Sequence, residues 1–361
     1  MAAAYYSAFT VQSGQVPATM TDFPVGILEA GLARLKTVGN GGHVQNANGY
    51  DIRPYSDAGL TSALTFQLVY FNATTGALEM YVNLASLDDG AVIYLGYGDA
   101  GISTDGSSTS TWNANFKAVY HFGDGATLSL ADSTSNARTL TNNNTVTATA
   151  AHVVGGSAGF ASASSQWLGN TAGGAPIADT PGTISCLVYN TDFAANQKCV
   201  SIGSTAANSV QFDVGPRTTA IIRASHNNAQ ANSAGTYSTA TWVHAGARFA
   251  SDTDRSVYLN GTGTQSTTSA TDVTPAQLAI GAQKTSDAAA LFMNGRLDEV
   301  RISDVDRGAN WMTTEYNNLV APSTFYAVGT EVAVGASFTP PEDFWTQPPL
   351  GDEDRIVTVW Q

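Results

Sequence analysis

The stretch FMNGRLDEVRISDVDRGANWMTTEYNNLVAPSTFY, residues 292–326, holds the signals from which the fold can be argued. In its first part, residues 295–302, the apolar residues Leu297, Val300 and Ile302 are interspersed with charged residues. Such alternation is typical of a strand that places one face in a core and the other toward water. We therefore expect a strand here, half-buried in a β structure.

The second part of the stretch predicts a short helix. Ser303 and Asp304 offer capping side chains ahead of Met312, Tyr316 and Leu319, which recur at helical spacing. Pro322 is expected to end the helix, because proline removes a backbone donor. A return to strand over 323–328 would then close off a β sandwich.

The stretch resembles the end of a laminin G-like, concanavalin A-type jelly roll, where a Gly-x-Leu/Ile-Asp-Glu-Val-Arg-Ile strand precedes one small helix. Upstream blocks occur in the order found in that family: GTISCLV at 182–188, WVH at 242–244, SVYLNG at 256–261 and LAIG at 278–281. Strand candidates recur about every ten residues, the spacing of an all-β sandwich. The resemblance implies a jelly-roll sandwich over residues 113–330.

Residues 1–112 are predicted to form a separate, small antiparallel β domain. Short β-rich segments at 23–28, 64–71, 78–82 and 91–98 are separated by the turn signals Asn48-Gly49, Thr75-Gly76 and Asp89-Gly90. The unit resembles an uncharacterised domain family commonly found N-terminal to laminin G-like sandwiches. That family has no established activity, so the resemblance of the first domain implies an architecture and no function. The predicted fold class is all-β, with two β domains and a C-terminal arm.

Composition excludes several classes of partner. The chain has 29 acidic and 15 basic residues, and its net charge of -14 argues against a nucleic-acid surface, which needs clustered Lys and Arg. No segment reaches membrane-spanning length, so no membrane insertion is expected. The N-terminus lacks the basic and apolar regions of a secretory signal, and Met1 favours cytoplasmic synthesis. Cys186 and Cys199 form no metal motif; a disulfide and two buried free thiols are both open.

No catalytic constellation is evident, and we expect no enzyme activity. Hydrolases on this jelly roll place carboxylates in an E-x-D-x-x-E strand pattern, which is missing. The nearest acidic pair, Asp298-Glu299, is expected to point to opposite faces of its strand and to be structural. The five histidines, scattered singly along the chain, are expected to be hydrogen-bonded structural residues; they are His43, His121, His152, His226 and His244.

Sugar binding is the best-supported binding chemistry. Aromatic faces and amide side chains on a sandwich rim suit sugar rings and their hydroxyls. The candidate residues are Trp167 and Asn170 in one cluster and His226 and Asn227 in another. Core or turn roles are the alternative, and we favour them: truncation of Trp167 is expected to cost much stability.

No cofactor is expected, although the resemblance leaves calcium open. Many laminin G-like domains bind calcium through loop oxygens, but no calcium motif of the family can be matched here. Asp124, Asp132 and Asp213 are loop carboxylates that could serve. The metal site is otherwise unknown.

Residues 331–361 differ from the rest of the chain in being acidic and rich in proline and aromatic residues. Such a segment has no core of its own, and we interpret it as an arm that docks on a neighbouring subunit. Docking on its own domain is an equal alternative. The docking residues are predicted to be Phe338, Phe344, Trp345 and Trp360.

Two functions from different classes fit these features. The first is a non-enzymatic structural protein of a large assembly, above all a bacteriophage virion component such as a capsid decoration, tail or fibre protein, which meets cell-surface glycans through its sandwich. The second is a secreted or cell-surface bacterial carbohydrate-binding protein. A glycoside hydrolase or lyase is a weaker third, because it requires a carboxylate pair that the sequence lacks.

Overall fold

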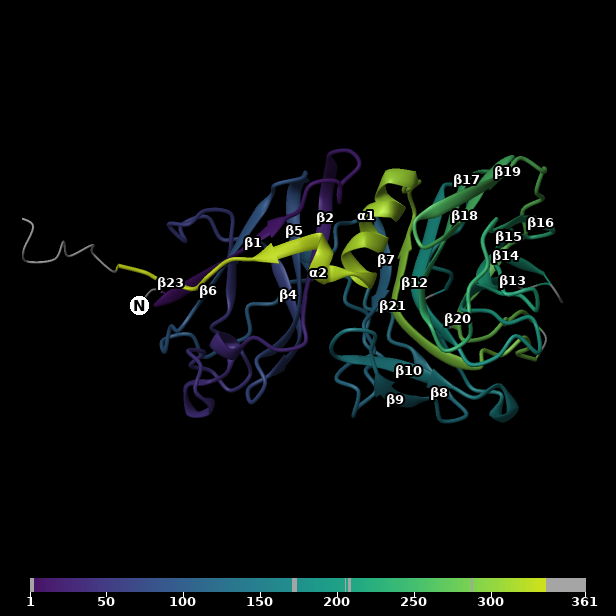
Figure 1. The fold of residues 1–361 in the computed structure, drawn as a ribbon. Coiled ribbons are helices and arrows are strands. Elements are labelled where there is room, and N and C mark those ends of the chain that lie inside the picture. The colour runs from purple at the N-terminus through teal and green to yellow at the C-terminus, as the bar shows by residue number, and fades with distance from the viewer. Residues whose placement is uncertain (1–2, 171–173, 205, 207–208, 287, 336–361) are drawn as a thin grey trace, which may run out of the picture.

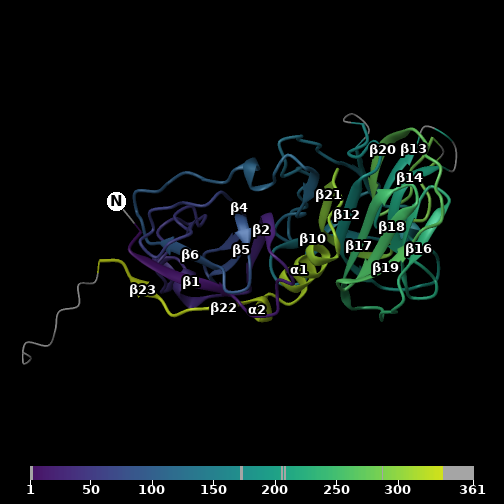
Figure 2. The ribbon, with the colours of Figure 1, turned by 90° about the horizontal axis from the view of Figure 1, so that it is seen from above.

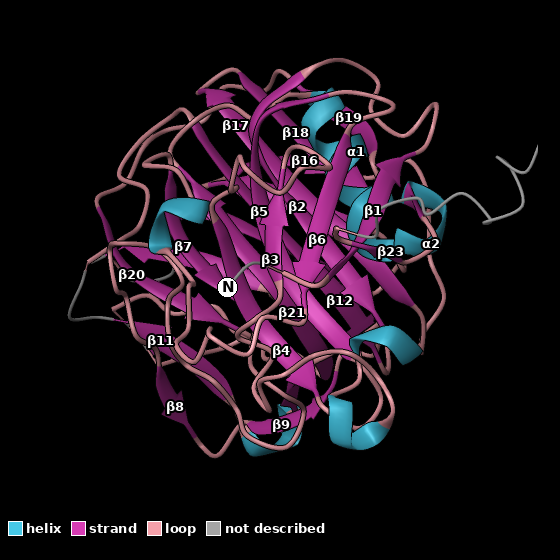
Figure 3. Cartoon of the chain, turned by 90° about the vertical axis from the view of Figure 1, so that its left-hand side faces the viewer, coloured by secondary structure: helices cyan, strands magenta, loops and turns pink. Residues whose placement is uncertain are grey.

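The computed structural model describes residues 3–335, apart from 171–173, 205, 207, 208 and 287. The described chain is nearly all-β, and its sheets stand as four layers from one end of the molecule to the other (Figures 1 and 2). The strand pairs between named strands are antiparallel, as expected of a jelly roll and of hairpin-rich β domains. Figure 3 shows how few helices accompany them.

Layers 1 and 2 belong mainly to the N-terminal part of the chain. Layer 1 has the order β22 (Tyr326–Val328), β1 (Tyr5–Val11), β6 (Val92–Tyr97) and β3 (Arg53–Tyr55), and β23 (Val332–Ala333) also pairs with β1. Layer 2 has the order β2 (Met20–Glu29), β5 (Ala77–Leu87) and β4 (Phe66–Asn72). The predicted strands and glycine turns are confirmed, since Gly49, Gly76 and Gly90 all have positive φ.

Layers 3 and 4 form the sandwich. Layer 3 has the order β19 (Thr262–Ser266), β18 (Asp254–Leu259), β17 (Trp242–Ser251), β12 (Gly182–Asn190), β21 (Gly295–Ser303), β10 (Gly156–Phe160) and β9 (Thr147–Ala150), and β7 (Phe116–Tyr120) also pairs with β21. Layer 4 has the order β16 (Ala229–Asn232), β15 (Ile222–His226), β14 (Val210–Pro216), β13 (Val200–Ser204), β20 (Pro275–Ile280), β11 (Trp167–Asn170) and β8 (Thr141–Asn143).

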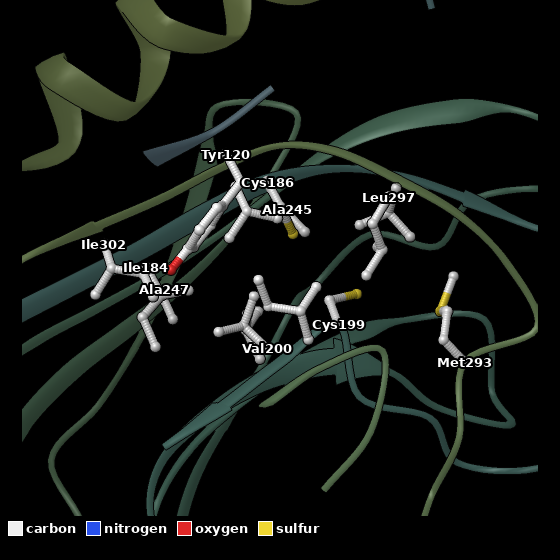
Figure 4. Packing of buried hydrophobic residues seen from close by; sticks show 14 of the residues in the cluster. Tyr120, Ile184, Cys186, Cys199, Val200, Ala245, Ala247, Met293, Leu297 and Ile302 are labelled. Carbon is white, nitrogen blue, oxygen red and sulfur yellow. The ribbon is translucent and has the colours of Figure 1, made fainter. Parts of the chain in front are cut away.

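The facing sides of layers 3 and 4 enclose one hydrophobic core (Figure 4). Ile184 and Ile302 come from layer 3, and Val200 comes from layer 4. Cys186 and Cys199 are free and buried in this core, and burial raises the pKa of the Cys199 thiol well above its usual range. Both cysteines therefore pack as small apolar residues here.

A second core spans the boundary between the two halves of the molecule. It joins residues of layers 1 and 2, such as Phe23 and Met80, to Leu187 on the outer side of layer 3 and to Trp311 and Leu319 of helix α1 (Ala309–Val320). The halves consequently share buried apolar surface, whose removal from water favours docking.

The predicted helix exists but begins later than expected. Its N-cap is Gly308, not Ser303 or Asp304, because β21 extends through Ser303. Pro322 ends α1 and also occupies the first turn of α2 (Pro322–Phe325), where a proline needs no backbone donor. Four short 3₁₀ segments complete the list of helical elements: Ala33–Leu35, Val38–Asn40, Thr109–Thr111 and Ser162–Ser164.

The strand expected over 323–328 does not close the sandwich. Only β22 forms there, and it pairs with β1, so the C-terminal segment returns to the N-terminal half. Asn318 of α1 and Tyr326 of β22 also provide hydrogen-bond partners for the unpaired backbone groups along the free edge of β2. Asn318 accepts from the N–H of Gly26 and donates to its carbonyl, at 2.7 and 2.9 Å, and the hydroxyl of Tyr326 does the same for Leu28.

Candidate functional site

The densest group of ionisable residues lies buried between layers 2 and 3. Strand β5 supplies Glu79, β21 supplies three residues, and α1 and β17 close the group from the side. Every member is at most 5% exposed. We call it the interface cluster: Glu79, His121, His244, Asp298, Glu299, Arg301 and Glu315.

A β-bulge brings the two acidic residues of β21 to the same side. The pairing with β12 shifts between Ser185 and Leu187, so that two residues of β21 lie opposite Cys186, and Glu299 has a φ of 49°. Asp298 and Glu299 consequently line one small cavity that faces Glu79. The expectation that they point to opposite faces is wrong, because simple alternation fails at a bulge. β21 is also buried along most of its length, not on one face alone.

Hydrogen bonds and ion pairs connect the cluster into a chain. The Nδ1 of His121 lies 2.5 Å from Glu299 Oε1, and Arg301 Nη2 donates to Glu299 Oε2 at 2.7 Å. Arg301 Nη1 then donates to Glu315 Oε2 at 3.3 Å, and His244 Nε2 lies 3.0 Å from Glu315 Oε1. The guanidinium of Arg301 also stacks over Tyr81 and Trp112. The hydrogen bonds and ion pairs link residues of the sandwich half to one another, and the stacking of Arg301 on Tyr81 of β5 reaches across to layer 2.

Burial and charge act on the four carboxyl groups in opposite directions. Burial, followed by the negative charges of its carboxylate neighbours, raises the pKa of Glu79 well above its usual range, and likewise that of Asp298. Burial alone would raise the pKa of Glu299, but the charges of His121 and Arg301 and their hydrogen bonds lower it to about 2. Arg301 and His244 likewise outweigh burial at Glu315 and hold its pKa below the usual range. The cluster thus combines ionised and proton-retaining acids.

The cluster has no room for a substrate. The adjoining cavity has a volume of about 10 Å³, roughly one water molecule, and it is lined by Leu28, Leu187 and Leu319 as well as by the acids. Three members, Glu79, His121 and Glu299, bring ligand atoms within 4.8 Å of one another, a spacing in which a metal ion is conceivable. The 2.5 Å contact between His121 and Glu299 is, however, a hydrogen bond, since two ligands of one ion at about 2 Å stand further apart. The arrangement is that of a buried ionic network in the sandwich half, packed against Glu79 and Tyr81 of β5.

The five histidines all have hydrogen-bond partners, as predicted. Besides the two in the interface cluster, His43 contacts Glu331, His152 contacts the Val320 carbonyl and His226 contacts Asp272.

Trp167 lies on the outer face of layer 4, so the core role favoured from the sequence is wrong. It belongs to neither core and is half-buried, whereas its neighbour Leu168 points inward. Its six-membered ring lies over Gly169, where any Cβ would come within 2.2 Å of the ring. Across the strand pair it faces Asn143 of β8. Asn170, by contrast, is buried and donates to the Thr139 carbonyl.

The second predicted sugar cluster lies elsewhere and is turned inward. His226 is fully buried against the ring of Phe212, and its Nε2 lies 2.8 Å from Asp272. Asn227 donates to the Thr271 carbonyl from a turn with φ of 48°. β15 and β11 are separated by three strands, which corresponds to roughly 19 Å. The structure therefore does not bring the four predicted sugar residues into one site.

The three carboxylates considered for calcium each have local partners, and Asp213 lies within strand β14, not in a loop as expected. Asp124 accepts from the N–H groups of Ala126 and Thr127, and Asp132 accepts from three backbone N–H groups around its own loop. Asp213 forms a buried ion pair with Lys198 at 2.6 Å. The expectation of no cofactor, with calcium as an open alternative, stays a prediction. The docking residues Phe338, Phe344, Trp345 and Trp360 lie outside the described residues.

A larger pocket of about 430 Å³ opens where the two halves meet beside the start of α1. Three segments line it: residues 19–22 at the start of β2, Asn113 and Asn115 of the connection between the halves, and residues 306–311. Most of its lining side chains are polar. Its volume is in the range of small-molecule sites.

The sequence contained one hint of the interface cluster, a charged residue within an apolar segment. Glu79 stands in the apolar segment Leu78–Val82 of a chain in which only 12% of residues are charged. Alternation there predicts Glu79 and Tyr81 on one face, which is easily taken as the solvent face. The junction pocket gave no signal, because its walls come from segments nearly 300 residues apart.

Comparison with known proteins agrees with this architecture. Residues 164–311 match the model of the concanavalin A-like lectin/glucanases superfamily. No curated protein sequence matches the chain. Within the part of the chain that the structure describes, no helix is long and apolar enough to cross a membrane.

Among solved structures, domain 4 of an extracellular GH43 arabinanase from Geobacillus stearothermophilus, in complex with arabinotriose, is 18% identical with a TM-score of 0.43, covering 55% of this chain and 97% of that one. The binding domain of botulinum neurotoxin serotype G is 12% identical with a TM-score of 0.41, covering 56% and 50%. Ruminococcus gnavus IT-sialidase CBM40, bound to α2,3-sialyllactose, is 10% identical with a TM-score of 0.35, covering 39% and 84%. Likenesses of this size say nothing about the ligand of this chain. The family match and the sheet architecture together identify residues 164–311 as part of a concanavalin A-like, lectin-like β-sandwich domain.

Proposed function

We propose that this protein is a non-enzymatic structural component of a large assembly, in the first place a bacteriophage virion, and that it displays its sandwich toward cell-surface glycans. The observation that carries the proposal is where the chain ends lie. The N–H of Val334 donates to the Ala4 carbonyl, and β23 pairs with Tyr5 and Tyr6. Both described ends therefore leave the molecule side by side at layer 1, opposite the sandwich (Figures 1 and 2).

This placement suits an attached protein that presents one domain outward. An arm that continues from residue 335 and docks on a neighbouring subunit would hold layer 1 against the assembly. Layer 4 would then be the surface furthest from the attachment point. The shared core and the stacking of Arg301 on Tyr81 support a stiff connection between the two halves.

The outer face of layer 4 offers a sugar-binding platform at Trp167. Residues 282–286 lie against another part of this face: Ser201 donates to the Ala282 carbonyl, and Gln277 donates to the Thr285 carbonyl. Trp167 stays half-exposed beside Asn143 and the exposed Thr141. An indole lying flat on a sheet offers its π face to the apolar side of a sugar ring, and amide and hydroxyl groups beside it suit sugar hydroxyls.

The absence of catalysis is supported by the enclosure of the interface cluster, in which four carboxyl groups lie buried together. An enzyme would need substrate access to such acids, and the adjoining cavity holds about 10 Å³.

Attachment is tested by deleting residues 338–361. The truncated chain should fold with an unchanged circular dichroism spectrum and fail to co-purify with particles from the source material. Normal incorporation would overturn the attachment role. Recovery of the full-length protein as a free monomer would instead favour a secreted or cell-surface carbohydrate-binding protein.

Glycan binding is tested on an array with the full chain, Trp167→Ala and Trp167→Phe. Loss of one stacking platform should weaken binding about tenfold or more in the alanine variant, and phenylalanine should retain much of it. Repeating the array with a calcium chelator tests whether calcium contributes. Unchanged binding by Trp167→Ala would remove Trp167 from the site.

A further inference from the structure

The pocket at the junction of the two halves contains two independent features that attract an anion. The first is the start of α1. Gly308 occupies its N-cap position without any side chain to cap the helix, and the first turn has no acidic residue. The leading N–H groups of a helix carry partial positive charge and lack partners within the helix. Residues 308–311 line the pocket.

The second feature is the guanidinium of Arg307, which also lines the pocket. Arg307 is only 8% exposed and is held between the rings of Phe116 and Trp311, at 4.3 and 3.8 Å. Its Nε donates to Ser303 Oγ at 3.1 Å and Nη2 is enclosed by the protein, which leaves Nη1 as the guanidinium nitrogen that a ligand in the pocket can reach. An N–H of a positively charged guanidinium is a strong hydrogen-bond donor to a carboxylate oxygen.

The positive charge of Arg307 has no carboxylate in direct contact among the described residues. No described carboxylate lies within ion-pair distance of its guanidinium. Asp306 lines the same pocket, but it forms an ion pair with Arg248 at 2.5 Å, and Arg248 also pairs with Asp254. Burial lowers the pKa of Arg307 to about 10, which still leaves it positive at neutral pH. Arg307 therefore attracts a negatively charged ligand group.

The opposite wall of the pocket suits hydroxyl groups. Asp22 has no ion-pair partner among the described residues, and Thr19, Thr21, Asn113 and Asn115 add further polar side chains. A carboxylate in this position repels a bare anion but accepts hydrogen bonds from hydroxyls. Trp311 is covered by Arg307, so ring stacking contributes little here.

We propose that the junction pocket binds a small polyhydroxylated carboxylate, with its carboxylate on Arg307 and the start of α1 and its hydroxyls toward Asp22 and the neighbouring amides. Such a group occurs at the end of an acidic sugar chain and in free sugar acids. This site is separate from Trp167 and does not depend on the glycan platform proposed there. It exists only while the two halves are docked, since both build its walls.

The test is isothermal titration calorimetry of the full chain with methyl β-glucuronide and with gluconate, which separate a sugar-ring ligand from a free sugar acid. Glucose lacks the carboxylate and acetate lacks the hydroxyls, so both should bind about tenfold or more weakly than the better acid. Equal binding of acetate and both acids, or no heat from either acid up to millimolar concentration, would overturn the proposal.

Variants locate the site. Asn310→Asp places a negative charge in the first turn of α1, which should maintain or raise the melting temperature while weakening acid binding about tenfold or more. Arg307→Lys keeps the charge but loses the planar group that is held between Phe116 and Trp311, and should also weaken binding. Asn228→Asp makes the same substitution at an exposed position of the sandwich, outside the pocket, and should leave acid binding unchanged. Full affinity in Asn310→Asp would contradict this location, whatever the glycan array shows for Trp167.

Discussion

Glu79 and Glu299 show how one buried environment can favour opposite protonation states. Glu299 has two cationic partners in direct contact, whereas Glu79 lies 3.9 Å from His121 and has a buried Oε2 without a partner among the described residues. A carboxyl group that has lost its water and gained no close cation retains its proton. The pair therefore predicts contrasting effects for the same substitution.

Glu299→Gln should lower the free energy of unfolding by roughly 3 kcal/mol at pH 7, because it leaves the positive charge of Arg301 less compensated in a buried site. Glu79→Gln resembles the protonated acid and cannot ionise in the unfolded chain, so at pH 7 it should not lower the free energy of unfolding and should instead raise it. Urea unfolding followed by tryptophan fluorescence measures both. Equal losses in the two variants would contradict the assignment of charge.

The pH dependence of the stability follows from the lowered pKa of Glu299 and the raised pKa of Glu79. Glu299, with its pKa lowered to about 2, stabilises the fold above the unfolded value of 4.5, and this contribution is lost as the pH falls toward 2. Glu79, with its pKa raised, retains a proton that the unfolded chain releases above about pH 4.5, so its presence lowers stability as the pH rises. The stability of Glu79→Gln relative to the natural chain should therefore increase from about pH 4 to pH 8. A difference that is flat or declines with pH would refute the raised pKa.

Trp167→Ala should lower the melting temperature only slightly, because the indole packs on the outer face of layer 4 and in neither core. Phe249→Ala serves as the contrast, since Phe249 is fully buried in the sandwich and its truncation should cost about 3–5 kcal/mol. Differential scanning fluorimetry compares them. A loss for Trp167→Ala as large as that for Phe249→Ala would return Trp167 to a structural role.

At the scale of elements, helix α1 replaces a missing strand at the edge of layer 2. β2 has β5 on one side only, and its free N–H and C=O groups at Gly26 are taken up by Asn318 of α1. Edge groups that are buried without partners are costly, so a side chain that both donates and accepts is needed.

Asn318→Ala should therefore destabilise the protein by about 2–4 kcal/mol, because both backbone groups of Gly26 lose a buried partner. Asn317→Ala is the matched control: its amide makes one bond, to the Gln15 carbonyl, and is only partly buried. Hydrogen exchange at the Gly26 amide gives the direct readout. Unchanged protection of that amide in Asn318→Ala would show that the bond contributes little.

At the scale of the whole molecule, the two halves share one hydrophobic core. The second core includes residues of layers 1 and 2 together with residues from layer 3 and α1, and β22 returns the chain to layer 1. Neither half can unfold without exposing apolar surface of the other.

Calorimetry of the full chain should accordingly show one unfolding transition, and Glu299→Gln should shift it downward without splitting it. Two transitions in the natural chain, with one at the temperature of an isolated residue 1–112 fragment, would mean that the halves fold independently.

Local pattern was sufficient for the all-β class, for the main strands of the N-terminal half and for a short helix before Pro322, because strand alternation, glycine turns and proline act within a few residues. The partner of β22, the shared face of Asp298 and Glu299, the outward position of Trp167 and the junction pocket were decided only in the folded chain. Each depends on contacts between distant segments or on a bulge that interrupts the regular period of two. Side-chain periodicity describes a strand but does not specify which strand lies beside it.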